Sequence, residues 1–241
     1  MILSIEPNSF EFQLFFTLTV FLLIIKLILA VYLAKELYIK KKKTGKLSFD
    51  FLLSLFILIL CMFVSRLLYI QFDFIYTEFN PDKYHTYPSA LIWQIATFII
   101  MLGYGIFVFI VDKRLLDFKI KGILAYILII VGVIILIYPV NTADDFEFLA
   151  SLLLIGNIVA VIIPIIFIYI GLKTPNLRKP FYSMAFGIII YAIGANLMNT
   201  ALLEIMISAL GSQIQIIMVF LFLVFKITGL IMIIYGARKI F

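Results

Sequence analysis

Three ionisable side chains lie inside long apolar runs of this sequence, namely Lys26, Arg66 and Lys226. A charged side chain in the middle of a bilayer costs a few kcal/mol on insertion scales, so such residues usually face a polar interior and mark a binding or transport site. Lys26 and Lys226 lie near the middle of their runs, which carry no carboxylate at that depth. Deprotonation, a more distant acid or a bound anion must therefore compensate each ammonium group, unless neighbouring backbone carbonyls do so.

Because the two lysines are predicted at similar depths, we expect them to face one polar cavity that favours an anionic guest. Three asparagines in other apolar runs are placed to add neutral polar groups: Asn157, Asn196 and Asn199. Asn196 and Asn199 are three residues apart, so they share one face of a helix. These asparagines, the two lysines and Arg66 form the predicted ligand-binding set.

Arg66 has a different setting, because an acid follows it in the stretch SRLLYIQFD. Asp73 comes seven residues later, which is two turns of helix, so on a straight α-helix the two side chains point the same way without touching. Two interpretations stay open. Arg66 either reaches the outer interface with Asp73 or Glu204 as its partner, or forms a lid at the mouth of an outward-facing cavity.

Pro164 interrupts another apolar run, seven residues after Asn157. Proline removes a backbone donor and bends a helix, so the bend is either a packing feature or a hinge beside the polar site. Small residues predict where helices approach each other closely. The small residues in question are Gly103, Gly187, Gly194 and Ala195.

Recognisable catalytic chemistry is missing from the sequence. It contains no HExxH, GxSxG or Walker-type glycine motif, and no pair of acids within the apolar runs. One cysteine, Cys61, and one histidine, His85, are too few for a cysteine or histidine metal cluster. We therefore expect no catalytic residues, no metal site and no cofactor, and the protein is not predicted to be an enzyme.

Membrane-spanning helices are the elements that must position these residues. Hydrophobic residues make up 65% of the 241 residues and charged residues 13%, which is far from the balance of a soluble protein. Seven runs reach the roughly 20 apolar residues with which a helix crosses a bilayer core of about 30 Å. The runs cover residues 12–34, 50–72, 89–111, 122–141, 147–171, 181–204 and 214–237. The sequence thus predicts a single all-α domain over residues 1–241, a polytopic protein of the cell membrane with seven transmembrane helices.

The loops between these runs predict the orientation. Fifteen of the nineteen Lys and Arg residues fall in alternate loops and at the C-terminal end, which the positive-inside rule makes the cytoplasmic side. Lys83 is the one basic residue in a loop on the other side. The N-terminus is therefore predicted outside and the C-terminus in the cytoplasm. The run Lys40, Lys41, Lys42 and Lys43 is also placed to bind anionic lipid headgroups, whereas short basic clusters without interleaved aromatic residues do not predict nucleic-acid binding.

Two stretches of the sequence carry a resemblance to known proteins. SRLLYIQFDFIY and VDKRLL are similar to stretches of uncharacterised archaeal seven-helix membrane proteins, and the layout resembles the seven-helix input modules of prokaryotic sensory proteins. The resemblance implies a receptor-like module in signal transduction. Such modules are normally followed by an output domain, and this sequence ends at Phe241, so we expect a separate cytoplasmic protein partner.

Two alternative functions stay open. One is a small transporter or channel for an anionic solute, with Lys26 and Lys226 near the midplane. Helices one to three and five to seven have matching predicted orientations, as an internal repeat would require, although the two halves show no convincing sequence match. The other is an accessory subunit that stabilises a membrane complex and needs no active site.

Overall fold

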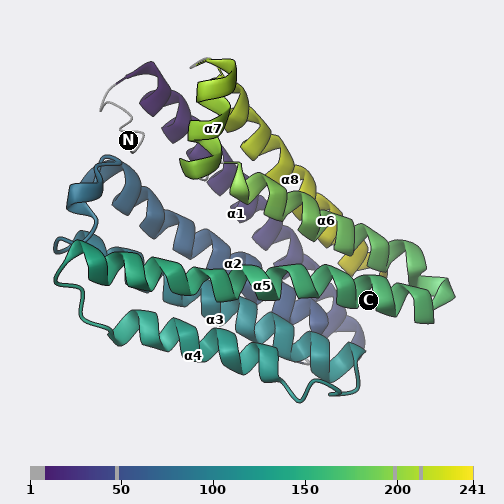
Figure 1. Ribbon diagram of the computed structural model, residues 1–241. Coiled ribbons are helices and arrows are strands. Elements are labelled where there is room, and N and C mark those ends of the chain that lie inside the picture. Colours follow the sequence, from purple (N-terminus) through teal and green to yellow (C-terminus); the bar gives the residue numbers. More distant parts are fainter. Residues whose placement is uncertain (1–8, 47–48, 198–199, 212–213, 241) are drawn as a thin grey trace. The chain divides into compact units, whose positions relative to one another are not determined.

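The computed structural model describes residues 9–46, 49–197, 200–211 and 214–240. In this part of the chain every regular element is a helix (Figure 1). The α-helices are α1 (Phe10–Thr44), α2 (Phe51–Ile70), α3 (Ser89–Leu115), α4 (Ile123–Ile137), α5 (Ala143–Lys173), α6 (Arg178–Asn196), α7 (Thr200–Leu210) and α8 (Ile214–Ile240). The shorter elements are the π-helix η1 (Gln71–Tyr76) and the 3₁₀-helices η2 (Pro81–Lys83) and η3 (Pro175–Leu177). The prediction of an all-α protein is confirmed for the described residues.

Five of the described helices are long and apolar enough to cross a membrane, judged by length and composition. They are α1, α2 with its continuation η1, α3, α5 and α8. Helix α4 is apolar as well but has 15 residues, a length of about 22 Å. Long apolar helices of this kind are consistent with the predicted membrane location.

Internal contacts group the chain into two compact units. The α2–α4 unit comprises Leu23–Thr77 and Asp82–Val159. The α6–α8 unit comprises the residues up to Leu22, the segment Glu78–Pro81 and the residues from Ala160 onward. Helices α1 and α5 contribute to both units, and each unit is described by itself.

Glycines bring neighbouring helices close together in the α2–α4 unit. A Cβ atom at Gly103 of α3 would lie 2.6 Å from the Cβ of Cys61 on α2. A Cβ at Gly132 of α4 would lie 3.0 Å from the Cβ of Met101 on α3. Neither position has room for a larger side chain without movement of its neighbour. The close approach predicted at Gly103 is confirmed.

Helix α4 ends four residues earlier than the apolar run that predicted it. Its last residue is Ile137, and Tyr138 is extended with ψ 127°, because Pro139 follows and disfavours a helical residue before it. Gln94 of α3 binds this end of the helix. Its Nε2 donates to the carbonyls of Ile135 at 2.8 Å and of Tyr138 at 2.7 Å, so carbonyls that the ended helix leaves free are satisfied by a neighbouring helix.

The turn between α3 and α4 is organised by Asp112, which is buried at the end of α3. One carboxylate oxygen accepts from the backbone N–H of Ile120 at 3.0 Å, and the other accepts from that of Gly122 at 2.7 Å. Gly122 has φ +71°, in the region that favours glycine. A buried carboxylate with two backbone donors therefore holds a turn whose other charged residues are exposed.

Helices α6 and α8 pack backbone to backbone in the α6–α8 unit. A Cβ at Gly187 would lie 2.8 Å from the Gly229 carbonyl oxygen, and a Cβ at Gly229 would lie 2.6 Å from the Gly187 carbonyl oxygen. Ser183 Oγ also donates to the Met232 carbonyl at 2.9 Å across the same pair. The contacts predicted at Gly187 and Gly194 are confirmed, whereas Ala195 is exposed.

The apolar run 181–204 was predicted as one helix, but α6 ends at Asn196 and α7 begins at Thr200. The side chain of Asn196 donates to the Ala192 carbonyl of its own helix at 2.9 Å, and such bonds compete with the backbone ladder. The N–H of Leu197 is shared between the carbonyls of Ile193 and Gly194, which tightens the last turn. Local hydrogen bonding thus ends a helix that apolar content alone would continue.

Candidate functional site

Lys26 is buried, with 4% of its surface exposed. Its side chain extends from α1 to α2, where Nζ donates a hydrogen bond to the Met62 carbonyl at 3.2 Å. Compensation by a backbone carbonyl, one of the possibilities left open by the sequence, is therefore present. A single carbonyl is a modest partner for a buried ammonium group, so other groups around Lys26 decide its electrostatic environment.

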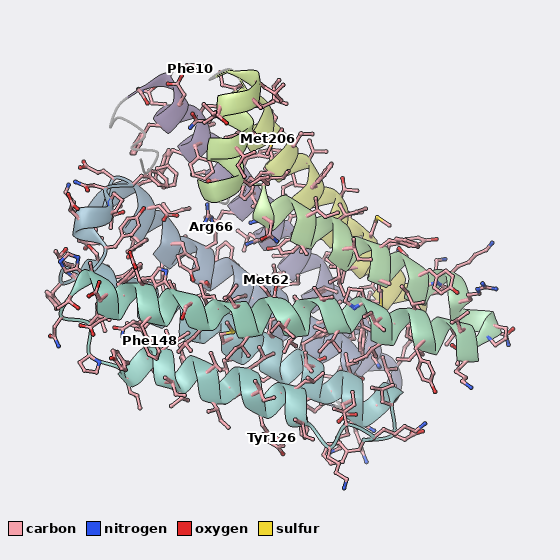
Figure 2. All side chains as sticks on the ribbon, viewed as in Figure 1. Phe10, Met62, Arg66, Tyr126, Phe148 and Met206 are labelled. Atoms are coloured by element: carbon pink, nitrogen blue, oxygen red, sulfur yellow. The ribbon has the colours of Figure 1, made fainter. Side chains whose placement is uncertain are left out.

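Arg66 is the charged group nearest to this contact along α2. It follows Met62 by one helical turn (Figure 2), so Lys26 donates to the α2 backbone about 6 Å along the axis before Arg66. The positive charge of Arg66 acts on the Lys26 amine. A basic amine and a guanidinium group thus interact in the α2–α4 unit, and a negative partner between them would interact favourably with the charged form of each.

Asp73 provides a carboxylate for Arg66. Its Oδ2 lies 3.7 Å from Arg66 Nη1, and both side chains are largely buried. Asp73 is in η1, where the chain continues α2 as a π-helix. The turn of a π-helix is wider than that of an α-helix and closes with i→i+5 bonds, which places Asp73 differently from the straight helix assumed above. Thr77 ends the element with such a bond, because its N–H and Oγ1 both donate to the Phe72 carbonyl at 3.0 and 2.7 Å.

The hydroxyl groups of Tyr69 and Thr97 lie near the charged residues. Tyr69 and Thr97 share a hydrogen bond of 2.7 Å between α2 and α3, and the charges of both Arg66 and Asp73 act on the Tyr69 hydroxyl. Tyr84 lies in the segment between η2 and α3. Burial and the Asp73 carboxylate together raise the pKa of its hydroxyl to about 12. Tyr84 therefore stays protonated and neutral at physiological pH.

Together these residues form what we call the Lys26–Arg66 cluster, defined by Lys26, Arg66, Asp73, Tyr69 and Thr97. Its titratable members are an amine, a guanidinium group and a carboxylate. Its neutral members are hydroxyls that either donate or accept hydrogen bonds. The cluster has the charges and donors to bind an anion, but it has no nucleophile activated by a neighbouring base.

Lys226 has a different environment in the α6–α8 unit. Its Nζ lies 4.1 Å from the centroid of the Phe222 ring, one turn earlier on α8, and 5.5 Å from that of Tyr191 on α6. Aromatic faces attract cations, by about 2 kcal/mol when the pair is desolvated. The Lys226 amine thus has aromatic compensation, whereas Lys26 has a carbonyl and a like-charged neighbour. The two lysines belong to different units.

The remaining predicted site residues are more dispersed. Asn157 and Asn196 are exposed on α5 and α6, and the Asn196 amide is bound to its own helix. Asn199 and the side chain of Glu204 lie outside the described residues. Pro164 is buried inside α5, which continues on both sides of it.

The basic run from Lys40 to Lys43 is split by the structure. Lys40 forms an ion pair with Asp50 at 2.6 Å, and Asp50 also caps α2 by accepting from the N–H groups of Leu52 and Leu53. Lys41, Lys42 and Lys43 are exposed in the last turn of α1, where cations suit the helix dipole. These three lysines are the exposed members of the run.

Sequence reasoning missed Tyr69, Thr97 and Gln94 as polar contacts between helices. The signal was present, because Gln94 and Thr97 are polar residues three apart in an apolar run and so share one face of α3. Which residues of α2 and α4 they contact depends on tertiary packing, and this packing cannot be predicted from the residue pattern. Among the described residues, no group of three His, Cys, Asp or Glu side chains is placed to hold a metal ion.

Comparisons with protein-family models, with curated proteins and with solved structures found no match to this chain. The buried Lys26 and the largely buried Arg66 on neighbouring helices, with one carboxylate and two hydroxyls near them, are the strongest chemical feature that the described residues present.

Proposed function

We propose that this protein spans the membrane seven times, with its N-terminus outside and its C-terminus in the cytoplasm. In this topology the seven spans are the five long apolar helices, helix α4, and helices α6 and α7 taken together as one span. The distribution of loop lysines and arginines supports the orientation. The extended Tyr138 after α4 adds to the length of a helix of 15 residues, which by itself is shorter than a bilayer core of about 30 Å.

Within this topology the protein is a receptor-like sensor that binds an anionic solute at the Lys26–Arg66 cluster and acts through a separate cytoplasmic partner. The observation that carries the proposal is the burial of Lys26 beside Arg66. Placing two cations together inside a membrane is costly, and a bound anion recovers part of that cost. Binding energy of this kind shifts a conformational equilibrium if one conformation holds the anion more tightly than the other.

Purified protein tests the proposal directly. Thermal unfolding is followed in low-salt buffer while sodium chloride, acetate, phosphate or sulfate is added at equal ionic strength. A specific ligand at 100 times its dissociation constant stabilises the folded state by about 2.7 kcal/mol, and one anion should stand out from the rest. Lys26→Met should lose this selective stabilisation.

Lys35→Met is the matched control, because Lys35 is on the same helix but exposed. It removes the same charge and should keep the response of the parent protein. Equal stabilisation by all four salts, or an equal response in Lys26→Met and Lys35→Met, would contradict binding at the cluster.

Transport of an anionic solute is the second candidate. The observation that favours it is the end of α6 at Asn196 and the start of α7 at Thr200 within one predicted span, since discontinuous helices often build transporter sites. Proteoliposomes loaded with the stabilising anion distinguish the two functions. Protein-dependent flux that is lost in Lys26→Met would favour transport, and binding without flux would favour the sensor.

A further inference from the structure

Arg66 carries a planar guanidinium group that matches the two oxygens of a carboxylate. In the structure one such oxygen, Oδ2 of Asp73, lies 3.7 Å from Nη1. Hydrogen bonds between guanidinium and carboxylate groups are usually about 2.7–2.9 Å long, so this Nη1–Oδ2 contact is a loose one. The carboxylate and the arginine lie on one continuous helical stretch and are close without being tightly joined.

We infer that the anionic ligand is a small carboxylate, or another planar oxyanion, which binds Arg66 in place of Asp73. The inference rests on the proposed anion site and identifies its chemical class and its competitor. The Asp73 carboxylate has the same chemistry as the proposed ligand, and the chain itself holds it near Arg66. A free carboxylate must compete with this high local concentration.

Lys26 gives the free ligand an advantage over Asp73 alone. Its ammonium group is at the Met62 carbonyl, one turn before Arg66 on α2, so a carboxylate between the two cations gains attraction from both. The Tyr69–Thr97 pair has hydroxyl hydrogens that an oxyanion accepts. A halide ion has no planar pair of oxygens for the arginine, so the geometry favours a carboxylate over chloride.

Displacement of Asp73 also has a consequence outside the helices. The carboxylate acts on Tyr84, whose ring packs against Phe72 and Phe146 with centroids 5.2 and 5.6 Å away. Phe72 is the residue before Asp73 in η1. Release of the carboxylate would therefore act on the π-helix and on the aromatic contacts that join it to α5, and these contacts are the means by which the proposed sensor would change state.

Asp73→Asn tests the inference, because asparagine keeps the shape and removes the competing charge. Acetate is titrated against the parent and the variant, with chloride exchanged for acetate at constant total salt. The acetate affinity of Asp73→Asn should rise roughly tenfold, within the usual range of coupling between two sites. Glu147→Gln is the matched control, because Glu147 is an exposed acid on α5 and the substitution changes net charge equally; its affinity should stay that of the parent.

The outcomes separate the inference from the proposed function. Acetate binding that is unchanged or weaker in Asp73→Asn, or stronger binding of chloride than of acetate, overturns the inference while leaving an anion site in place. No binding of any anion to parent or variant overturns the proposed function as well. Arg66→Lys provides a second arm, since it keeps the charge without the planar fork and should lose the preference for acetate over chloride. Retention of that preference would also overturn the inference.

Discussion

Arg66 and Asp73 approach within 3.7 Å, although an α-helix would separate residues seven apart by about 10.5 Å along its axis. Two features close the gap. The long arginine side chain spans much of the distance, and the π-helix that contains Asp73 has a wider turn than an α-helix. The ion pair therefore depends on the π geometry of residues 71–76, and the Thr77 hydroxyl at the end of that element becomes a means of testing it.

Thr77→Val should destabilise the protein by about 1 kcal/mol, the usual net value of one hydrogen bond. Valine has the shape of threonine, and Thr77 is fully buried, so the main loss is the bond from Oγ1 to the Phe72 carbonyl. Unfolding in denaturing detergent measures the change. Thr86→Val is the control, because Thr86 makes a similar bond to the Lys83 carbonyl at an exposed site. Equal stability of both variants would show that Thr77 does not hold the π-helix.

Packing of α6 against α8 gives a second prediction. Gly187→Ala would place a Cβ 2.8 Å from the Gly229 carbonyl oxygen, and backbone atoms cannot move aside cheaply. We expect a loss of about 1–3 kcal/mol, as for other overpacked sites, measured by unfolding. Gly156→Ala is the control, because its Cβ would meet only the flexible end of Met101 at 2.8 Å. A Gly187→Ala variant as stable as Gly156→Ala would contradict the backbone contact.

Composition was enough to predict the helical class, because lipid leaves helices as the way for apolar segments to satisfy their backbone hydrogen bonds. It also predicted the close contact at Gly103, since a glycine in an apolar helix has few other uses. Helix ends were predicted less well. Pro139 stops α4 early because it restricts the backbone of Tyr138, and the Asn196 side chain contributes to the end of α6 through a local hydrogen bond. Hydropathy weighs neither effect.

The candidate site was predictable only as separate residues. Lys26 and Arg66 stand out as charges in apolar runs, yet the contact of Lys26 on α1 with the backbone of α2 depends on how these helices pack. The approach of Asp73 to Arg66 depends on a π-helix, and the residue types of the segment QFDFIY do not predict that π-helix. Tyr69 is amphipathic and common in membrane proteins, so its hydroxyl contact with Thr97 could not be told from the sequence.

Cysteine labelling tests the proposed topology. In a Cys61→Ser background, single cysteines replace Lys43, Phe118, Asn176, Asp82 or Asp144, and a membrane-impermeant maleimide is added to intact cells. The last two positions should label from outside, and the first three should label only after the cells are lysed, because the basic loops stay in the cytoplasm. Any position on the opposite side would contradict the seven-span arrangement.

Lys226→Met tests whether Lys226 and Lys26 have different roles, as their different surroundings indicate. The Lys226 amine lies over Phe222 and near Tyr191, so aromatic rings contribute to the compensation of its charge. The variant should be as stable as the parent within about 1 kcal/mol, because methionine keeps most of the stem and the lost cation–π attraction is offset by the lower cost of a neutral side chain in lipid.

The anion response is the decisive measurement for this variant. If Lys26 and Arg66 form the site without Lys226, Lys226→Met should keep the selective thermal stabilisation that Lys26→Met loses. If both lysines hold one guest, as their similar predicted depths suggest, the two single variants should lose it equally and the double variant should add little. Phe222→Leu provides a further check on the aromatic contact. It should lower stability in the parent, where Lys226 needs the ring, by more than it does in the Lys226→Met background, and equal effects in both backgrounds would show that the ring does not stabilise the amine.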